Sequence, residues 1–317
     1  MDVPGVIVGV DGSDTSYAAF VHAAWEAQVR GLPLYLLHCH DVPAGLAALR
    51  LAPKLDSAAE AAAERLADLA EQARAAFPGL QVATFVASGP PGATLVRASE
   101  QAELVVVGSR GLGGFRGLLL GSVGTQLSAH SAAPLIVVRP DADQPPPELG
   151  SAPPRRPVVV GVDGAADSDA AIELAFGEAS TRGVPVVVLY AWWMLPVTHM
   201  PADPDLEGAQ EQARRLLVDA TADARAAWPE VEVELRPAHA LNPVQALLDA
   251  SDGAGLLVVS RHGGNALSRL IFSSAGDAAV RHASCPVAVV PEISTKDSAV
   301  RAEAEAEGEH AHARRGR

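Results

Sequence analysis

The chain has 317 residues, more than an average domain, and 49% of them are hydrophobic, so two domains with buried cores are expected. Val, Leu and Ala dominate, while aromatic residues make up only 4%, which suits parallel sheets covered on both faces by helices. The formal net charge of −14 argues against a nucleic-acid-binding protein or a membrane-surface protein, because both need Lys and Arg to meet phosphate groups.

One segment of the chain occurs twice, at an offset of 152 residues. VIVGVDGS at 6–13 matches VVVGVDGA at 158–165, and HSAAPLIVV at 130–138 matches HASCPVAVV at 282–290. The sequence therefore predicts a tandem pair of similar domains.

The composition between and after the copies predicts the domain boundaries. The Pro-rich residues 141–156 favour an extended linker. The last residues, 294–317, have almost no large apolar side chain to bury and indicate a disordered, charged tail. We therefore expect a first domain over 1–140 and a second over 157–293.

Short apolar runs alternate with helical patterns along the first copy. A helix is predicted from Ser57, whose spacing to Glu60 fits a capping box, up to Pro78. Because strands separated by helices run parallel with right-handed crossovers, each copy should form a doubly wound α/β sheet, which binds ligands at the carboxyl ends of its strands. The five predicted strands are 5–10, 34–39, 82–86, 104–107 and 135–138.

A carboxylate follows the first predicted strand, in Asp11-Gly12-Ser13. At the carboxyl end of a strand it could accept hydrogen bonds from a ribose or an adenine amine. The alternative is local: Ser13 or Asp14 would cap the next helix. The sequence leaves both interpretations open.

A glycine-rich segment, GSRGLGGFRGLLLGSVG at 108–124, follows the fourth strand and has seven glycines in seventeen positions. Glycine permits positive φ and a close approach to a ligand, so successive N–H groups could converge on an anion. Gly121 and Ser122 then open a helical stretch, whose N-terminus favours phosphate. A Walker loop is rejected because its lysine is missing, and a dinucleotide fingerprint is rejected because its third glycine falls on Arg116.

The segment matches G-2x-G-9x-G-[ST], read as Gly108, Gly111, Gly121 and Ser122, and so resembles the nucleotide-binding signature of universal stress proteins. The opening VIVGVDGS and the closing APLIVV also resemble this family, and the resemblance covers both halves. It implies two five-stranded, Rossmann-like domains of the adenine nucleotide alpha hydrolase-like type. It also implies that the first domain belongs to the branch that binds ATP, with or without Mg²⁺.

The resemblance further implies a role for each matching residue. Asp11 would contact the adenosine, and Cys39 and Val107 would line the adenine pocket. Gly108, Arg110 and Gly111 would wrap ribose and phosphates. The full set of implied ATP-binding residues is Gly9, Asp11, Cys39, Val107, Gly108, Arg110, Gly111, Gly121, Ser122, Val123 and Gly124.

The second copy has lost part of the signature. Residues 157–293 carry 8 Lys and Arg against 18 Asp and Glu, a net charge of −10, whereas residues 1–140 carry 9 against 12, a net charge of −3. Two of the three signature glycines are replaced, by Ser260 and Ser273. If these positions require positive φ, a serine there costs on the order of 1 kcal/mol of conformational free energy. The expectation is weak or absent ATP binding, unless serine is tolerated. The equivalent residues are Asp163, Ser260, His262, Gly263, Ser273 and Ser274.

Three other features add less. His38, Cys39 and His40 suggest a metal, but strand alternation sends Cys39 to the opposite face from the histidines, so no metal site is assigned. Cys39 and Cys285 lie in different halves and form no disulfide framework, as in a reducing cytosol. The chain shows no signal-peptide pattern and no apolar stretch near 18 residues, so a cytoplasmic protein is expected.

Three functions are compatible with these observations: a nucleotide-dependent regulatory protein of the stress response, a slow ATP hydrolase or other adenine-nucleotide enzyme, and a structural scaffold. No catalytic residue can be assigned from the sequence. A regulatory role implies a protein partner that the sequence does not identify. Because family members dimerise through their last strand, 135–138 and 287–290 are expected to pair within the chain as a pseudo-dimer, with a homodimer also open.

Overall fold

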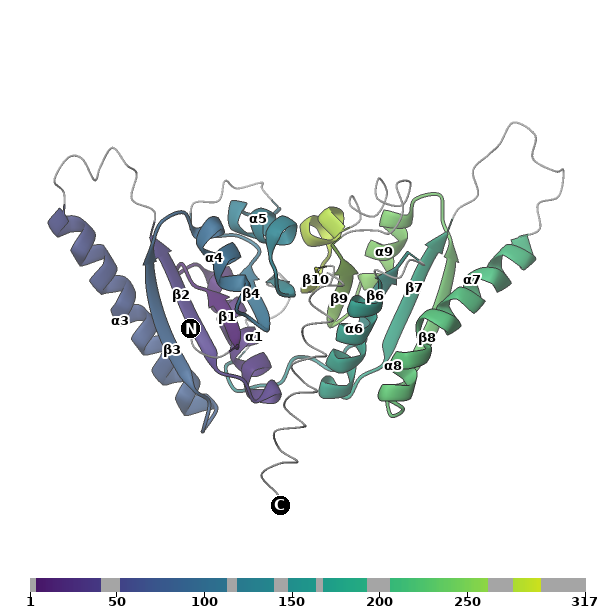
Figure 1. The fold of residues 1–317 in the computed structure, drawn as a ribbon, viewed down its shortest axis with the longest axis horizontal. Helices are drawn as coiled ribbons and strands as arrows, with labels where there is room; N and C mark the ends of the chain where they lie inside the picture. Colours follow the sequence, from purple (N-terminus) through teal and green to yellow (C-terminus); the bar gives the residue numbers. More distant parts are fainter. Residues whose placement is uncertain are drawn as a thin grey trace, which may run out of the picture.

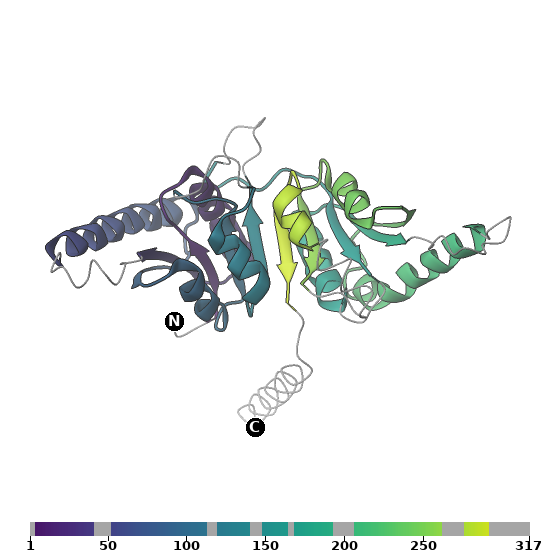
Figure 2. The same ribbon diagram turned by 90° about the horizontal axis from the view of Figure 1, so that it is seen from above.

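A computed structural model describes residues 4–40, 52–112, 119–139, 148–163, 168–192, 206–261 and 276–291. Within these residues the chain forms two similar α/β halves that meet along one pair of strands (Figures 1 and 2). No helix in these ranges has the length and apolar character needed to cross a membrane.

The first half contains the five predicted strands, and their positions are confirmed to within two residues. The helix expected from Ser57 begins earlier, at Ala52. Pro53 did not prevent this, because the N–H that proline lacks would have no acceptor in a first helical turn. The elements are β1 Val6–Gly9, α1 Asp14–Arg30, β2 Leu34–His40, α3 Ala52–Ala76, β3 Val82–Ser88, α4 Pro91–Ser99, β4 Leu104–Gly108, α5 Ser122–His130 and β5 Leu135–Val138.

The second half repeats this order. Residues 276–282 are also helical and precede the last strand. The elements are β6 Val158–Val162, α6 Asp169–Arg182, β7 Val186–Trp192, α7 Leu206–Ala220, α8 Ala222–Ala227, β8 Val233–His239, α9 Pro243–Ser251, β9 Leu256–Ser260 and β10 Val287–Val290.

All ten strands belong to one sheet, in the order β3-β2-β1-β4-β5-β10-β9-β6-β7-β8. The strands run parallel within each half, as the alternation of strands and helices predicted. The halves join where β5 and β10 pair antiparallel, with Val137 opposite Val287. The expected pairing of the two last strands is therefore present.

Helices cover both faces of the sheet, and each face has a core that spans the two halves. In Figure 1, α4, α5 and α9 lie along the upper side of the molecule, α1 and α6 lie lower near its middle, and α3 runs along its left side. Strand alternation divides the side chains of β1: Val6 and Val8 join the core with α1 and α6, whereas Ile7 joins the core with Leu127 of α5 and Leu247 of α9.

A cluster of four charges, which includes the buried carboxylates of Glu26 and Glu178, joins α1 to α6. Glu26 and Arg30 are related to Glu178 and Arg182 by the internal repeat, and each arginine pairs with both carboxylates. The Arg182 guanidinium also lies over the Trp25 ring, 5.0 Å from its centroid. We call Glu26, Arg30, Glu178 and Arg182 the interdomain charge quartet.

The pKa values of the two carboxylates in the quartet are shifted in opposite directions. Burial raises the pKa of Glu26, but the nearby His22 ring and the charges of Arg182 and Arg30 outweigh it and bring that pKa down to about 2. Burial and the nearby Glu26 charge raise the pKa of Glu178. As the pH falls, Glu178 therefore takes up its proton first.

Candidate functional site

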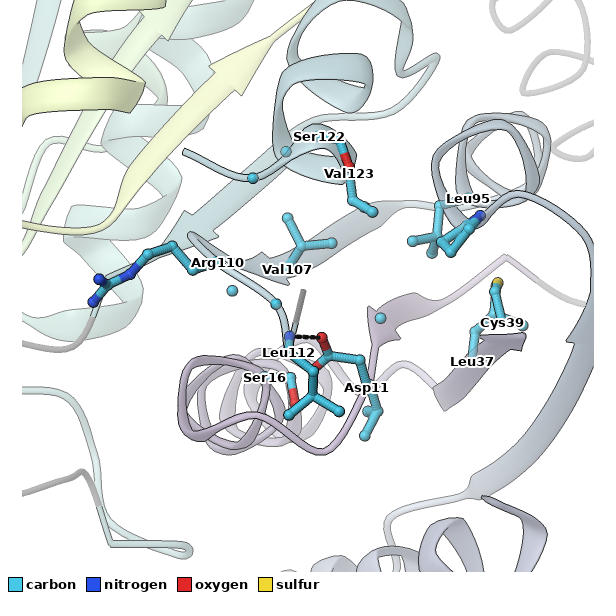
Figure 3. Close-up of a pocket in the computed structure, with 17 residues that line it drawn as sticks. Asp11, Ser16, Leu37, Cys39, Leu95, Val107, Arg110, Leu112, Ser122 and Val123 are labelled. Carbon is cyan, nitrogen blue, oxygen red and sulfur yellow. Dashed lines mark hydrogen bonds between the residues drawn. The ribbon is translucent and has the colours of Figure 1, made fainter. Parts of the chain in front are cut away.

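A cavity of about 440 Å³ opens at the carboxyl ends of β1, β2 and β4 (Figure 3). β1 lies between β2 and β4, and ligands of doubly wound sheets bind where the strand order reverses in this way. Every residue that the sequence assigned to the first site lines this cavity. The described residues that the sequence missed are Val10, Ser16, Leu37, Pro91, Leu95 and Leu112.

One end of the cavity is apolar. Leu37 and Cys39 approach from β2, Leu95 from α4 and Val107 from β4, and Figure 3 shows them around the same space. Burial raises the pKa of the Cys39 thiol to about 11, and the nearby Thr94 hydroxyl only partly offsets this effect. The thiol is therefore neutral at physiological pH and contributes apolar surface rather than a nucleophile.

Asp11 lines the cavity, and both oxygens of its carboxylate accept hydrogen bonds. Its Oδ1 accepts hydrogen bonds from the Ser13 backbone N–H (2.9 Å) and the Ser13 hydroxyl (2.6 Å). Its Oδ2 accepts one from the Leu112 N–H at 2.9 Å, drawn as the dashed line in Figure 3. Burial alone raises the pKa of Asp11, but these bonds hold it below its ordinary value, so the carboxylate is charged.

The Asp11 loop caps a helix, as one interpretation predicted, and it also places the carboxylate at the cavity. Ser13 is the N-cap of α1, and its side chain accepts a hydrogen bond from the Ser16 N–H. The same hydroxyl orients the carboxylate that lines the cavity. Helix capping and site construction are therefore done by one residue.

Two signature glycines are required by close packing. A Cβ atom at Gly108 would lie 2.6 Å from the backbone carbon and oxygen of Thr15, and one at Gly111 would lie 2.5 Å from Asp11 Oδ2. Neither glycine has positive φ. The expectation that positive φ explains the signature is therefore wrong for them: they bring the loop against the start of α1.

Gly121 has a different role. It is the N-cap of α5, with extended φ −77° and ψ 166°, so the expectation of positive φ is wrong here too. Its N–H donates to the Ser109 carbonyl at 2.8 Å, which fixes the entrance to α5. The first helical hydrogen bond of α5 runs from Thr125 N–H to Gly121 O. The N–H groups of Ser122, Val123 and Gly124 therefore come before the first hydrogen bond of the helix, and all three residues line the cavity.

Arg110 lines the cavity mainly through its backbone. Its carbonyl oxygen accepts a hydrogen bond from the Thr15 hydroxyl, and the Ser13 hydroxyl lies 3.5 Å away from it. Figure 3 shows its guanidinium directed away from Cys39 and Leu95. A contact between this side chain and phosphates therefore stays a prediction that would require the side chain to turn.

The sequence of both halves matches a known family. The model of the universal stress protein family fits residues 5–139 and again residues 154–291. The chain belongs to the universal stress protein family.

Its relatives are similar along their whole length. A universal stress protein of Mycolicibacterium smegmatis is 33% identical over 294 residues, which cover 90% of this chain and 96% of that protein. Another, from Mycobacterium tuberculosis, is 33% identical over 301 residues, covering 92% and 97%. The structure of a universal stress protein from Archaeoglobus fulgidus covers 92% of this chain and 100% of its own with a TM-score of 0.65 at 18% identity, which shows the same fold.

The second half of this universal stress protein is described in part around the equivalent site. Asp163 Oδ1 accepts a hydrogen bond from the Ser168 hydroxyl at 3.0 Å, and Ser260 ends β9 opposite Val290. The other residues assigned there, His262, Gly263, Ser273 and Ser274, lie outside the described residues. The predicted weakness of this site therefore stays a prediction.

The histidines of β2 have ordinary partners. His38 Nδ1 lies 2.8 Å from the Val10 carbonyl oxygen, and His40 Nε2 lies 2.9 Å from the Ser88 hydroxyl. Within the described ranges, no three His, Cys, Asp or Glu residues are grouped as a metal site.

Proposed function

We propose that this universal stress protein binds ATP in the first-domain cavity and acts as a nucleotide-dependent regulatory module of the stress response, read by a protein partner. The observation that carries the proposal is the composition of this one cavity. An apolar end, a charged carboxylate and the N-terminus of a helix all line it. Adenine, ribose and phosphates require these three environments.

Each part of ATP has residues suited to hold it. The apolar end at Leu37, Cys39 and Val107 would take the adenine ring, and Asp11 would accept hydrogen bonds from the ribose. The N–H groups at the start of α5 would bind the phosphates, together with the backbone at Gly108 and Gly111. Mg²⁺ would enter with the phosphates, as their counter-ion.

Binding is favoured over hydrolysis by the state of Asp11. It is the single carboxylate among the described residues that line the cavity, and no described lining residue is a histidine or lysine. Its lowered pKa and three hydrogen bonds make it a weak base, whereas a general base works best with a pKa near the operating pH. Slow ATP hydrolysis remains the second candidate, and the experiment below distinguishes the two.

The same proposal makes the second domain a weaker nucleotide site. Serines replace the glycines equivalent to Gly108 and Gly121. In the first half there is no space for such a side chain at position 108, because a Cβ there would lie 2.6 Å from the backbone of Thr15. We also propose a cytoplasmic location, in keeping with two cysteines that are not joined in a disulfide.

The test is calorimetric titration of nucleotide-free protein with Mg·ATP, with GTP as a base control and an assay for released phosphate. Gly121→Val is the critical variant. A Cβ at 121 would meet nothing closer than 3.7 Å, so the variant should fold, yet its side chain would narrow the passage between α5 and the backbone of Arg110. Ser273→Val, the equivalent change in the second half, is the matched control.

We expect one ATP per chain, binding at least tenfold weaker in Gly121→Val, unchanged binding in Ser273→Val, and no phosphate release. Phosphate release that disappears in Gly121→Val would establish the hydrolase instead. If the unmodified protein binds no ATP, the proposal is wrong.

A further inference from the structure

The phosphate end of the candidate site is tied to the second domain by one arginine. Arg139 directly follows β5, and its Nη2 lies 3.1 Å from the Leu119 carbonyl oxygen. The same nitrogen lies 3.0 Å from the carbonyl oxygen of Val280 and 2.8 Å from that of Arg281. Arg139 thus joins the segment that enters α5 to a helix of the other half.

The two sides of this contact have different chemistry. Val280 and Arg281 lie in the last turn of the helix at 276–282, where carbonyl oxygens lack helical donors and the helix dipole is negative. A guanidinium is a favourable cap there. Val280 is buried and packs in the core with Val287 and Val289, so this helix end is a firm support.

On the other side, Leu119 is two residues from the N-cap of α5. Leu120 is buried, and its side chain lies so close to Gly124 that a Cβ there would be 2.7 Å from it. The Gly121 N–H donates a hydrogen bond to the Ser109 carbonyl oxygen. The Ser109 N–H in turn donates to the carbonyl oxygen of Val138, the residue before Arg139. The backbone from Leu119 to Gly124 is therefore held between β5 and the Arg139 guanidinium.

A second guanidinium acts on the other end of α5. Arg261, at the end of β9 in the second half, donates from Nη1 to the carbonyl oxygen of Ser131, the C-cap of α5. The helix whose N-terminus lines the cavity is thus contacted by the second domain at its C-terminus and, through Arg139, just before its N-terminus.

We infer that Arg139 is a positioning residue of the ATP site, through which the second domain holds the phosphate-binding start of α5 in its binding conformation. This inference rests on the proposed function. Because the start of α5 is already ordered, ATP does not have to order it on binding. The binding free energy of ATP is then not spent on ordering this segment. The second domain, with its altered signature, then contributes to the first site as a support.

The burial of Arg139 also has an electrostatic side. Burial and the neighbouring Arg110 charge lower the pKa of Arg139. The two guanidiniums therefore repel each other beside the loop. A polyphosphate bound at the start of α5 would attract both charges and offset that repulsion. ATP binding should therefore strengthen the contacts that Arg139 makes with the two halves.

The test compares two arginine-to-methionine variants of the full chain. Arg139→Met removes the contact to Leu119, Val280 and Arg281. Arg155→Met is the matched control, because Arg155 also caps a helix end, donating to the Gly183 carbonyl at 2.6 Å, but within the second half and away from the cavity. Titration with Mg·ATP should show binding about tenfold weaker in Arg139→Met and unchanged in Arg155→Met. Arg139→Lys, which keeps the charge, should recover part of the loss.

Hydrogen exchange of the unmodified protein provides an independent readout. Because coupling between sites is reciprocal, saturating ATP should slow exchange at the amides of 279–283, in the second half. Equal ATP affinity in Arg139→Met and the unmodified protein, or exchange at 279–283 that ATP leaves unchanged, would overturn the inference. If Arg139→Met does not fold, the exchange measurement decides. Failure of the proposed function is distinguished by the absence of any ATP binding in the unmodified protein.

Discussion

The signature glycines meet very different surroundings in the folded chain. At Gly108 an added Cβ would lie 2.6 Å from backbone atoms of Thr15, which cannot move without displacing α1. At Gly121 the nearest atoms would be 3.7 Å away, an ordinary van der Waals distance. One glycine is required by the fold, and the other leaves space at the mouth of the cavity.

Alanine substitution should separate these two roles. Gly108→Ala should lower the free energy of unfolding by about 1–3 kcal/mol, because overpacking against a fixed backbone forces a shift. Gly121→Ala should change it by less than about 1 kcal/mol, since its φ and ψ suit any residue. Urea unfolding of both variants, followed by tryptophan fluorescence, measures the difference. Equal losses of stability in the two variants would contradict the packing argument.

At the scale of the element, the first turn of α1 links helix formation to the site. Ser13 caps the helix and donates to Asp11, and Ser16 donates to the Ser13 carbonyl at 2.9 Å. The second half has Ala165 at the position of Ser13. The two halves therefore differ at this turn as well as in the glycine loop.

Ser13→Ala should have two measurable effects. Loss of the N-cap should lower the free energy of unfolding by about 1 kcal/mol. Loss of the Ser13 hydroxyl bond should raise the pKa of Asp11 toward its ordinary value, because that bond favours the charged carboxylate. NMR titration of the Asp11 carboxyl carbon measures the pKa. Ser128→Ala is the control, because the Ser128 hydroxyl donates to Gly124 O within its own helix. An unchanged Asp11 pKa would show that the backbone bonds alone hold the carboxylate.

The sequence located the elements and the loop, but not every wall of the cavity. Gly-rich spacing and strand periodicity are local patterns, so they found β1, β4 and the entrance to α5. Pro91 and Leu95 come from α4, whose apolar spacing is that of any packed helix, and nothing local distinguishes a cavity wall from a core contact. The steric reason for Gly108 could not be predicted either, because it depends on a contact with Thr15, 93 residues away along the chain.

At the scale of the whole molecule, the halves are joined by more than β5 and β10. The interdomain charge quartet occupies the contact between α1 and α6, where Glu26 and Glu178 are almost completely buried. The repeat predicts that Glu26 corresponds to Glu178 and Arg30 to Arg182, but it does not predict that they meet. Their contact follows from the antiparallel junction, which brings the equivalent faces of α1 and α6 together (Figure 1).

Glu26→Gln should destabilise the protein in a pH-dependent way. At pH 7 it leaves Arg182 buried with one carboxylate fewer, at a cost of about 3–5 kcal/mol in the free energy of unfolding. The pKa of Glu26 is about 2 in the folded protein against an ordinary 4.5, so its stabilisation is complete above pH 4.5 and is lost as the pH falls toward 2. This linkage contributes roughly 3 kcal/mol.

The difference between Glu26→Gln and the unmodified protein should therefore shrink between about pH 5 and pH 2. Urea unfolding at a series of pH values measures it, with Glu211→Gln as the control, because Glu211 forms an exposed ion pair with Arg215. A difference that stays constant over this range would show that Glu26 has no lowered pKa.

The antiparallel junction also decides which strands remain available for pairing between chains. β5 has β4 on one side and β10 on the other, and β10 lies between β5 and β9. The outermost strands of the described sheet are β3 and β8. Two copies of this chain therefore cannot associate by pairing their last strands, and a homodimer would have to use another surface.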